Sequence, residues 1–187
     1  MPHLRIVTIL GFVALMFRSF SSDASILRDM TLAEMVADAD DIVVCTVLSV
    51  DSKWDSDHRN ILTSIQIKVD ENWKGTPPKD GKVTFVQQGG SVGDMEMSVQ
   101  GMPNFSKGER SLLFFRGGAR RFVVGMNMGK RPLQFDPATK KWLVKTASRE
   151  GILRVQRQAA DTVVTVDSDK EETLDSLRAK VRSLLAR

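Results

Sequence analysis

Ile61-Leu-Thr-Ser-Ile-Gln-Ile-Lys-Val69 is the stretch that decides the fold, because its side chains alternate in polarity. The odd positions hold β-branched residues throughout, whereas the even positions from Ser64 to Asp70 are polar. A period of two buries one face of a strand and leaves the other in water, as an antiparallel sheet or barrel wall requires. The segment therefore predicts a strand over residues 61–73 of a mainly β protein.

Strand and turn signals continue on both sides of this segment. The apolar run 42–50 predicts a central strand, and Asp80-Gly81 predicts a turn into a strand over 82–87. Two hairpins should follow, one across Gly117-Gly118 and one across the turn 136–139. The expected later strands are 110–116, 121–127, 133–135, 141–145, 152–156 and 162–166. Many short strands with regular turns predict a small, closed or nearly closed antiparallel barrel over residues 25–167.

Helix signals flank the strands at both ends. Thr31 and Glu34 form a capping-box pattern that should open a short helix. Ser168 and Glu171 repeat the pattern before an amphipathic segment, so a C-terminal helix is expected over 168–187. Its apolar stripe (Leu174, Leu177, Val181 and Leu184) is expected to pack on the parent domain.

The first 24 residues have the pattern of a secretory signal peptide. Arg5 precedes an uncharged apolar run over 6–17, and Ser22 and Ala24 supply small residues for cleavage after Ala24. Cleavage near Ser21 and retention as an uncleaved anchor are the alternatives. No cysteine stands at the cleavage region after the apolar run, which excludes a lipoprotein acylated on a new N-terminal cysteine. The expected location is therefore the periplasm or the exterior, with no stable membrane insertion after cleavage.

Composition excludes several classes of function. The net charge of +4 becomes +3 without Arg5, Arg18 and Asp23, which gives no reason to expect a nucleic-acid partner. Cys45 is the only cysteine, so no disulfide can form within the chain, and its apolar surroundings predict a buried thiol. With two histidines and one cysteine in the chain, a zinc site built from those ligands is not expected, and no cofactor is predicted.

The glycine-rich segment Gly89–Gly108 is the longest expected loop and the candidate binding surface. Gly89-Gly-Ser91-Val-Gly93 matches the G-x-S-x-G pattern of serine hydrolases. However, His58 comes before Ser91 in the chain, whereas an α/β-hydrolase places its histidine after the serine, and no helix signal follows Gly93. We therefore expect a turn here and no catalysis. Acidic pairs such as Asp55 and Asp57 lack the EF-hand spacing, which favours a solvated loop tip.

Methionines supply an alternative metal site. Thioether sulfurs suit Cu(I), whose handling is a task of the export compartment. The competing explanation is that methionine fills gaps beneath a loop. The candidate ligands are Met95, Met97, Met102, Met126 and Met128.

A set of short motifs resembles exported bacterial proteins of unassigned role. The motifs are Leu32 with Ala39-Asp-Asp-Ile-Val-Val44, Trp73-Lys-Gly75, Gly89-Gly90 with Gly93, Gly101–Glu109 and Leu112–Phe115. Their order is similar to that of an OB-like barrel related to the netrin-like domain of tissue inhibitors of metalloproteinases. In those inhibitors an N-terminal cysteine chelates the protease zinc and disulfides brace the fold. Neither feature is possible here, so that inhibitory mechanism is not carried over.

These observations together predict a non-catalytic exported protein that binds an unidentified protein or polymer partner. The residues expected to contact the partner lie in the loop Gly89–Gly108: Gly89, Gly90, Gly93, Met102, Pro103 and Phe105.

Overall fold

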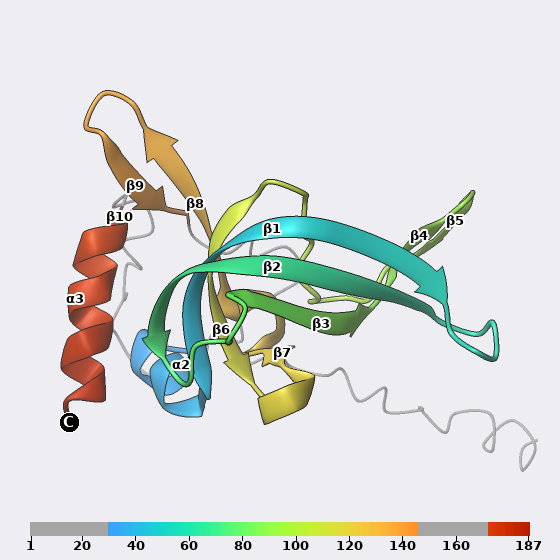
Figure 1. Cartoon of the computed structure of the whole chain (residues 1–187), viewed down its shortest axis with the longest axis horizontal. Coiled ribbons are helices and arrows are strands. Elements are labelled where there is room, and N and C mark those ends of the chain that lie inside the picture. The colour runs from blue at the N-terminus through green and yellow to red at the C-terminus, as the bar shows by residue number, and fades with distance from the viewer. Residues whose placement is uncertain (1–29, 146–171) are drawn as a thin grey trace, which may run out of the picture.

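The computed structural model describes residues 30–145 and 172–187, and an antiparallel sheet dominates it (Figure 1). The hydrogen-bonded strand order is β10-β9-β8-β6-β1-β2-β3, with β7 paired to β6 and a separate β4–β5 hairpin. The strands are β1 (Asp41–Trp54), β2 (Ile61–Lys74), β3 (Lys82–Gln88), β4 (Gly90–Val92), β5 (Met95–Met97), β6 (Arg110–Arg116), β7 (Phe122–Val123), β8 (Lys130–Asp136), β9 (Lys141–Val144) and β10 (Glu172–Thr173). The helices are α2 (Leu32–Asp38) and α3 (Leu174–Leu185), with short 3-10 turns η1 (Gly118–Arg120) and η2 (Met126–Gly129). The mainly β prediction is confirmed.

The long β1–β2 hairpin forms the spine of the sheet. Burial alternates from Ile61 to Ile67, as the sequence pattern predicts. The pairing contains three register shifts, between Ile42 and Val43, Val44 and Cys45, and Val47 and Ser49. Such irregularities bend the bulged strand and increase the local twist. The hairpin therefore curves along its length.

The sheet is strongly curved, but it is not closed. In a flat sheet β3 and β6 would lie roughly 14 Å apart, because β1 and β2 separate them and strands repeat every ~4.8 Å. Instead the rings of Phe85 on β3 and Phe115 on β6 meet edge to face with centroids 4.9 Å apart. β3 and β7 approach each other, yet no ladder joins them. Of the predicted closed or nearly closed barrel, full closure is wrong, because within the described residues no strand pairing seals the seam between β3 and β7.

Two helices cover one face of the sheet (Figure 1). The predicted capping box of α2 is confirmed: the Thr31 amide donates to Glu34 at 2.8 Å, and the Glu34 amide donates to the Thr31 hydroxyl at 3.2 Å. Met35 and Val36 of α2 and three stripe residues of α3 join one buried cluster with the sheet. Within that stripe Leu174, Leu177 and Val181 are buried.

The start of α3 differs from the expectation. The helix begins at Leu174, and its N-cap is Thr173, whose hydroxyl accepts from the Ser176 amide at 3.3 Å. The predicted cap at Ser168 and Glu171, the strands expected over 152–156 and 162–166, and the signal peptide lie outside the described residues.

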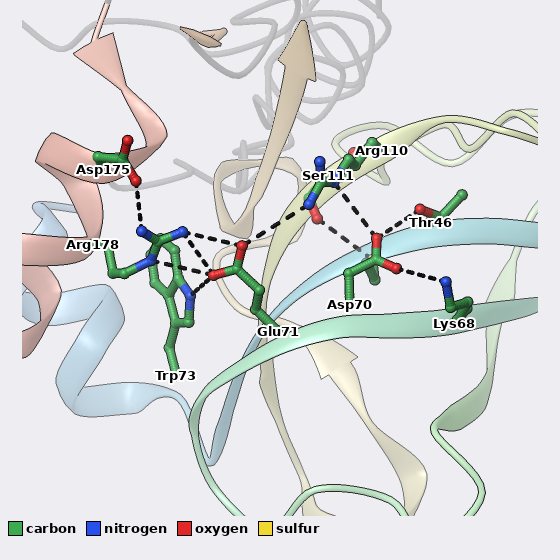
Figure 2. A network of polar contacts seen from close by, with 10 residues as sticks. Thr46, Lys68, Asp70, Glu71, Trp73, Arg110, Ser111, Asp175 and Arg178 are labelled. Atoms are coloured by element: carbon green, nitrogen blue, oxygen red, sulfur yellow. Dashed lines mark hydrogen bonds and ion pairs between the residues drawn. The ribbon is translucent and has the colours of Figure 1, made fainter. Parts of the chain in front are cut away.

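A network of charged side chains fastens α3 to the sheet (Figure 2). Arg178 donates to both carboxylate oxygens of Glu71 at 2.8–3.2 Å, and the Trp73 indole donates to the same carboxylate at 3.0 Å. The Arg178 guanidinium lies 5.6 Å from the centroid of the Trp73 ring. Nearby, Arg110 pairs with Asp70 at 3.5 Å and stacks over Trp142 at 4.3 Å. The helix is therefore held by directed polar contacts as well as by its apolar stripe.

The opposite, concave face has its own core. Val43, Cys45, Leu113 and Phe115 point into it from β1 and β6, and Phe85 reaches it from β3. Burial raises the pKa of the Cys45 thiol to about 12, and the nearby carboxylates of Asp70 and Glu109 add to the rise. The prediction of a buried, unreactive thiol agrees with this position.

Two predicted segments are built differently from the expectation. The strand expected over 121–127 is limited to β7, because Gly125 and Met126 adopt positive φ angles of 58° and 59° and lead into η2. The expected loop Gly89–Gly108 contains the β4–β5 hairpin. The hairpin predicted across residues 136–139 is confirmed by the β8–β9 pairing.

Candidate ligand-binding site

The loop Gly89–Gly108 projects as a small hairpin and then folds back onto the sheet. β4 pairs with β5 and contacts the outer half of the β1–β2 hairpin (Figure 1). Gly89 and Gly90 allow this approach, since a Cβ at Gly90 would lie 2.2 Å from the Thr63 hydroxyl. Thr63 also donates to the Gly89 carbonyl at 2.5 Å. The first two glycines thus set the base of the hairpin.

The returning half of the loop is anchored from within. Pro103 is buried, and its carbonyl accepts from the Gln87 amide at 2.9 Å. The Phe105 ring packs edge to face on Phe85 at 5.4 Å, and the Lys130 ammonium lies 4.6 Å from its centroid. These two residues, predicted as partner contacts, hold the loop in place.

A polar hollow lies between the loop and the sheet. Its volume is about 630 Å³, and it opens to solvent. Its lining is rich in primary amides and hydroxyls, and among the described residues that line it only Glu96 is charged. The amides and hydroxyls belong to Gln87, Gln88, Gln100, Asn104, Ser52, Thr63, Ser91 and Ser98. This chemistry suits an uncharged, hydrogen-bonding ligand.

A second, apolar groove of about 510 Å³ lies beside the unsealed edges of β3 and β7. Phe122 is 51% exposed and Val86 47% exposed, and both line the groove. Arg116 and Arg121 are the charged residues along it. The polar hollow and the apolar groove share three lining residues: Gln87, Gln88 and Met102. The two cavities therefore meet at the C-terminal end of β3.

Ser91 is not placed as a nucleophile. Gly93, with φ 58°, forms the turn of the β4–β5 hairpin. In a nucleophile elbow the chain after the serine would instead enter a helix. His58 lies in the β1–β2 turn with its ring stacked on Trp54, centroids 6.2 Å apart. Ser91 and His58 share no hydrogen bond. The pair lacks the contact through which a base activates a serine.

The candidate methionines are divided between different surroundings. Met128 is buried in the helix-covered core, and Met95 is 59% exposed on β5. Met97 and Met102 line the polar hollow, and Met102 and Met126 line the apolar groove. In residues 30–145 and 172–187 no group of three or more His, Cys, Asp or Glu side chains could hold a metal ion.

Acidic residues around the start of β1 and in the β1–β2 turn stabilise turns. Asp38 pairs with Arg116 at 3.3 Å and Asp41 with Arg121 at 3.1 Å, while Asp40 accepts from the Gly117 amide at 2.8 Å. These contacts fix the β6–β7 turn. Asp55 accepts from Arg59 and Asn60 in the β1–β2 turn, and these hydrogen bonds lower the pKa of its carboxyl.

No protein-family model, curated protein or solved structure matches this chain. Among the helices that the structure describes, none is long and apolar enough to cross a membrane.

The apolar groove was not predicted from the sequence. Val86 was the available signal, because it is an apolar residue on the polar parity of β3, between Thr84 and Gln88. Phe122 carried no equivalent signal, since its neighbours Val123 and Val124 are apolar too.

Proposed function

We propose that this protein is an exported, non-catalytic recognition protein whose partner binds on the surface formed by the loop Gly89–Gly108. The observation that most supports this proposal is the polar hollow beneath that loop, whose lining is rich in amides and hydroxyls. The loop is anchored by Pro103 and Phe105, so the surface is preorganised, which lowers the ordering cost of binding. The signal-peptide pattern of residues 1–24 supports export.

The fold part of this proposal is an open relative of the OB-like, netrin-like barrel. Its support is that the motifs of the resemblance meet in space. A Cβ at Gly75 would lie 2.1 Å from an Asp41 carboxylate oxygen, and β1 pairs with Leu112–Phe115 on β6. The motifs therefore serve the architecture, and function follows from the site.

The proposal is tested with a substitution that fills the polar hollow with a large side chain and leaves the buried core unchanged. Ser98 is exposed and lines the hollow, so Ser98→Trp should block it, whereas Lys107→Trp adds the same side chain on the same loop outside both cavities. Affinity capture from an extract of the source cells, quantified by mass spectrometry, should show partner recovery lost with Ser98→Trp. Recovery with Lys107→Trp should equal the wild type. Equal recovery with both variants would contradict the proposal.

Cu(I) binding is a second candidate, and one observation favours it. A Cβ at Gly101 would lie 3.0 Å from the Met126 sulfur, so this thioether lies against the residue next to Met102. Soft thioethers grouped in this way suit Cu(I). Anaerobic Cu(I) titration against a competing chelator should show binding that Met102→Leu weakens and Met95→Leu leaves unchanged. Binding equal in both variants would dismiss this site.

A further inference from the structure

We infer that the partner is an extended polypeptide segment, with apolar residues flanked by an acidic one, that docks along the outer edge of β3. This rests on the proposed function and names its partner class. The peptide would lie in the apolar groove and continue past Gln87 and Gln88 into the polar hollow.

The first support is the backbone of β3. The Gly81 carbonyl accepts from the Val69 amide, and the Gly89 amide donates to the Ile61 carbonyl, so both residues face β2. The register between them is regular, and backbone groups along a strand point alternately to either side. The groups of Thr84, Val86 and Gln88 therefore point away from β2. Within the described chain no strand pairs with that edge, and such an edge is a template for an added strand.

The second support is the apolar surface beside this edge. Val86 and Phe122 leave about half of their surfaces in water. An exposed apolar patch with a polar rim marks an interaction site. An extended peptide presents every second side chain to the same face, so its alternate residues would enter the groove while its backbone lies along β3.

The third support is charge. Of the described residues that line the groove, only Arg116 and Arg121 are charged. Arg116 pairs with Asp38, but both side chains are well exposed, at 57% and 40%. An exposed pair of this kind contributes little, so Arg116 can exchange Asp38 for a carboxylate of the partner. The groove therefore favours an acidic flank.

The fourth support is the amide lining where the cavities meet. Gln87 and Gln88 line both cavities, and Gln100 and Asn104 line the hollow. A primary amide donates and accepts, as a peptide unit does, so these side chains can pair with a main chain of any sequence. A lipid chain would fill the groove but would leave these amides and the strand edge unused.

The test begins with a phage-displayed library of random nonapeptides selected on the purified protein. Enriched sequences should alternate apolar residues and carry Asp or Glu at one end. The strongest peptide, labelled with fluorescein, is then titrated by anisotropy against wild type and variants. Val86→Pro removes an outward N–H, which an edge strand tolerates, and should weaken binding about tenfold or more. Val86→Thr keeps that N–H and should stay within about twofold.

Side-chain variants test the groove itself. Phe122→Ala should weaken binding about tenfold, and Arg116→Gln should weaken it about threefold and reduce its salt dependence. Circular dichroism checks folding, and if Val86→Pro fails to fold, Phe122→Ala and Arg116→Gln decide. If the variants bind the selected peptide as tightly as the wild type does, the assignment of the peptide site to this groove is wrong.

Other occupants are distinguished by separate measurements. Sedimentation showing a dimer that Val86→Pro dissociates would assign the edge to a second copy and overturn the inference. Oleate binding that is lost in Phe122→Ala, without peptide enrichment, would assign the groove to a lipid. If no peptide is enriched but Ser98→Trp still loses the captured partner, the peptide class is wrong and the proposed function stands. If Ser98→Trp has no effect either, both are wrong.

Discussion

The two faces of the sheet are built from the same strands but are completed in different ways. On β6, Leu112 and Phe114 point towards α2 and α3, while Leu113 and Phe115 point into the concave face. The first face is covered by helices and fastened by Arg178 and Glu71. The second has a core of its own, but it is left unsealed along the seam between β3 and β7, where Val86 and Phe122, on the other parity of their strands, reach solvent. The helix-covered core is thus closed, whereas the concave core is left open along one seam.

The difference between the covered core and the open seam predicts different effects of substitution. We expect substitutions under the helices to affect folding and substitutions at the seam to affect binding. A side chain buried under the helices loses its packing when it is truncated, and the cavity that remains adds to the cost. A side chain at the open rim loses little on truncation, because it was half in water before. Substitutions at the groove should therefore cost little stability.

The largest expected effect compares two phenylalanines. Phe114→Ala, in the helix-covered core, should lower the free energy of unfolding by about 3–5 kcal/mol. Phe122→Ala, at the groove, should lower it by less than about 1 kcal/mol. Urea denaturation followed by tryptophan fluorescence measures both. Similar losses would show that the helix-covered core and the open seam do not differ in this way.

The next effect concerns the fastening of α3. Arg178→Gln should lower the free energy of unfolding by about 1–2 kcal/mol, because it leaves the half-buried Glu71 carboxylate without its main partner. Arg182→Gln, an exposed change on the same helix, should stay within about 0.5 kcal/mol. The same denaturation assay applies. Equal stability of the two variants would mean that the apolar stripe alone holds the helix.

Cys45 tests whether the concave core is sealed beneath its open rim. With a pKa of about 12 the folded thiol stays protonated at pH 8, so iodoacetamide should label it only after unfolding. The stabilising contribution of the neutral thiol is complete below its ordinary pKa near 9, and it is lost as pH rises towards 12. Cys45→Ala should flatten that pH dependence. Rapid labelling of the native protein would contradict a sealed core.

The smallest effect is at the start of α2. Thr31→Ala removes the hydroxyl that caps Glu34 and should cost about 0.5–1 kcal/mol. Thr76→Ala, exposed in the β2–β3 turn, should cost less than about 0.5 kcal/mol. Thermal melts can resolve the pair. A neutral Thr31→Ala would show that packing of Met35 and Val36 alone positions this helix.

The sequence predicted those parts of the fold that rest on local rules. The alternation from Ile61, the capping box at Thr31 and the turn at Asp136 each depend on residues a few positions apart. Closure of the barrel could not be predicted this way, because it depends on whether β3 pairs with β7, which lies far along the chain. The short length of β7 follows from the positive φ of Met126, an unusual conformation for a residue with a side chain.

For the site, the sequence located the loop but not the roles of its residues. Gly89 and Gly90 set the hairpin base, but Pro103 and Phe105 serve as anchors, because Phe85 and Gln87 lie beneath them. The apolar groove was missed because its two walls come from strands that meet only after the sheet has curved. A pattern read along the chain cannot show two half-exposed residues from separate strands as one surface.

The pairing of β1 with β6 has a consequence for folding kinetics. The meander β1–β2–β3 joins neighbours in sequence, whereas Cys45 and Ser111 meet from positions 66 residues apart. Closing a long loop costs entropy before its contacts form, and non-local contacts slow folding. We therefore expect the meander to gain structure early and the arrival of β6 to limit the rate. A substitution at Val83, whose contacts form early, would then slow refolding more than Leu113→Ala in β6, which would mainly speed unfolding.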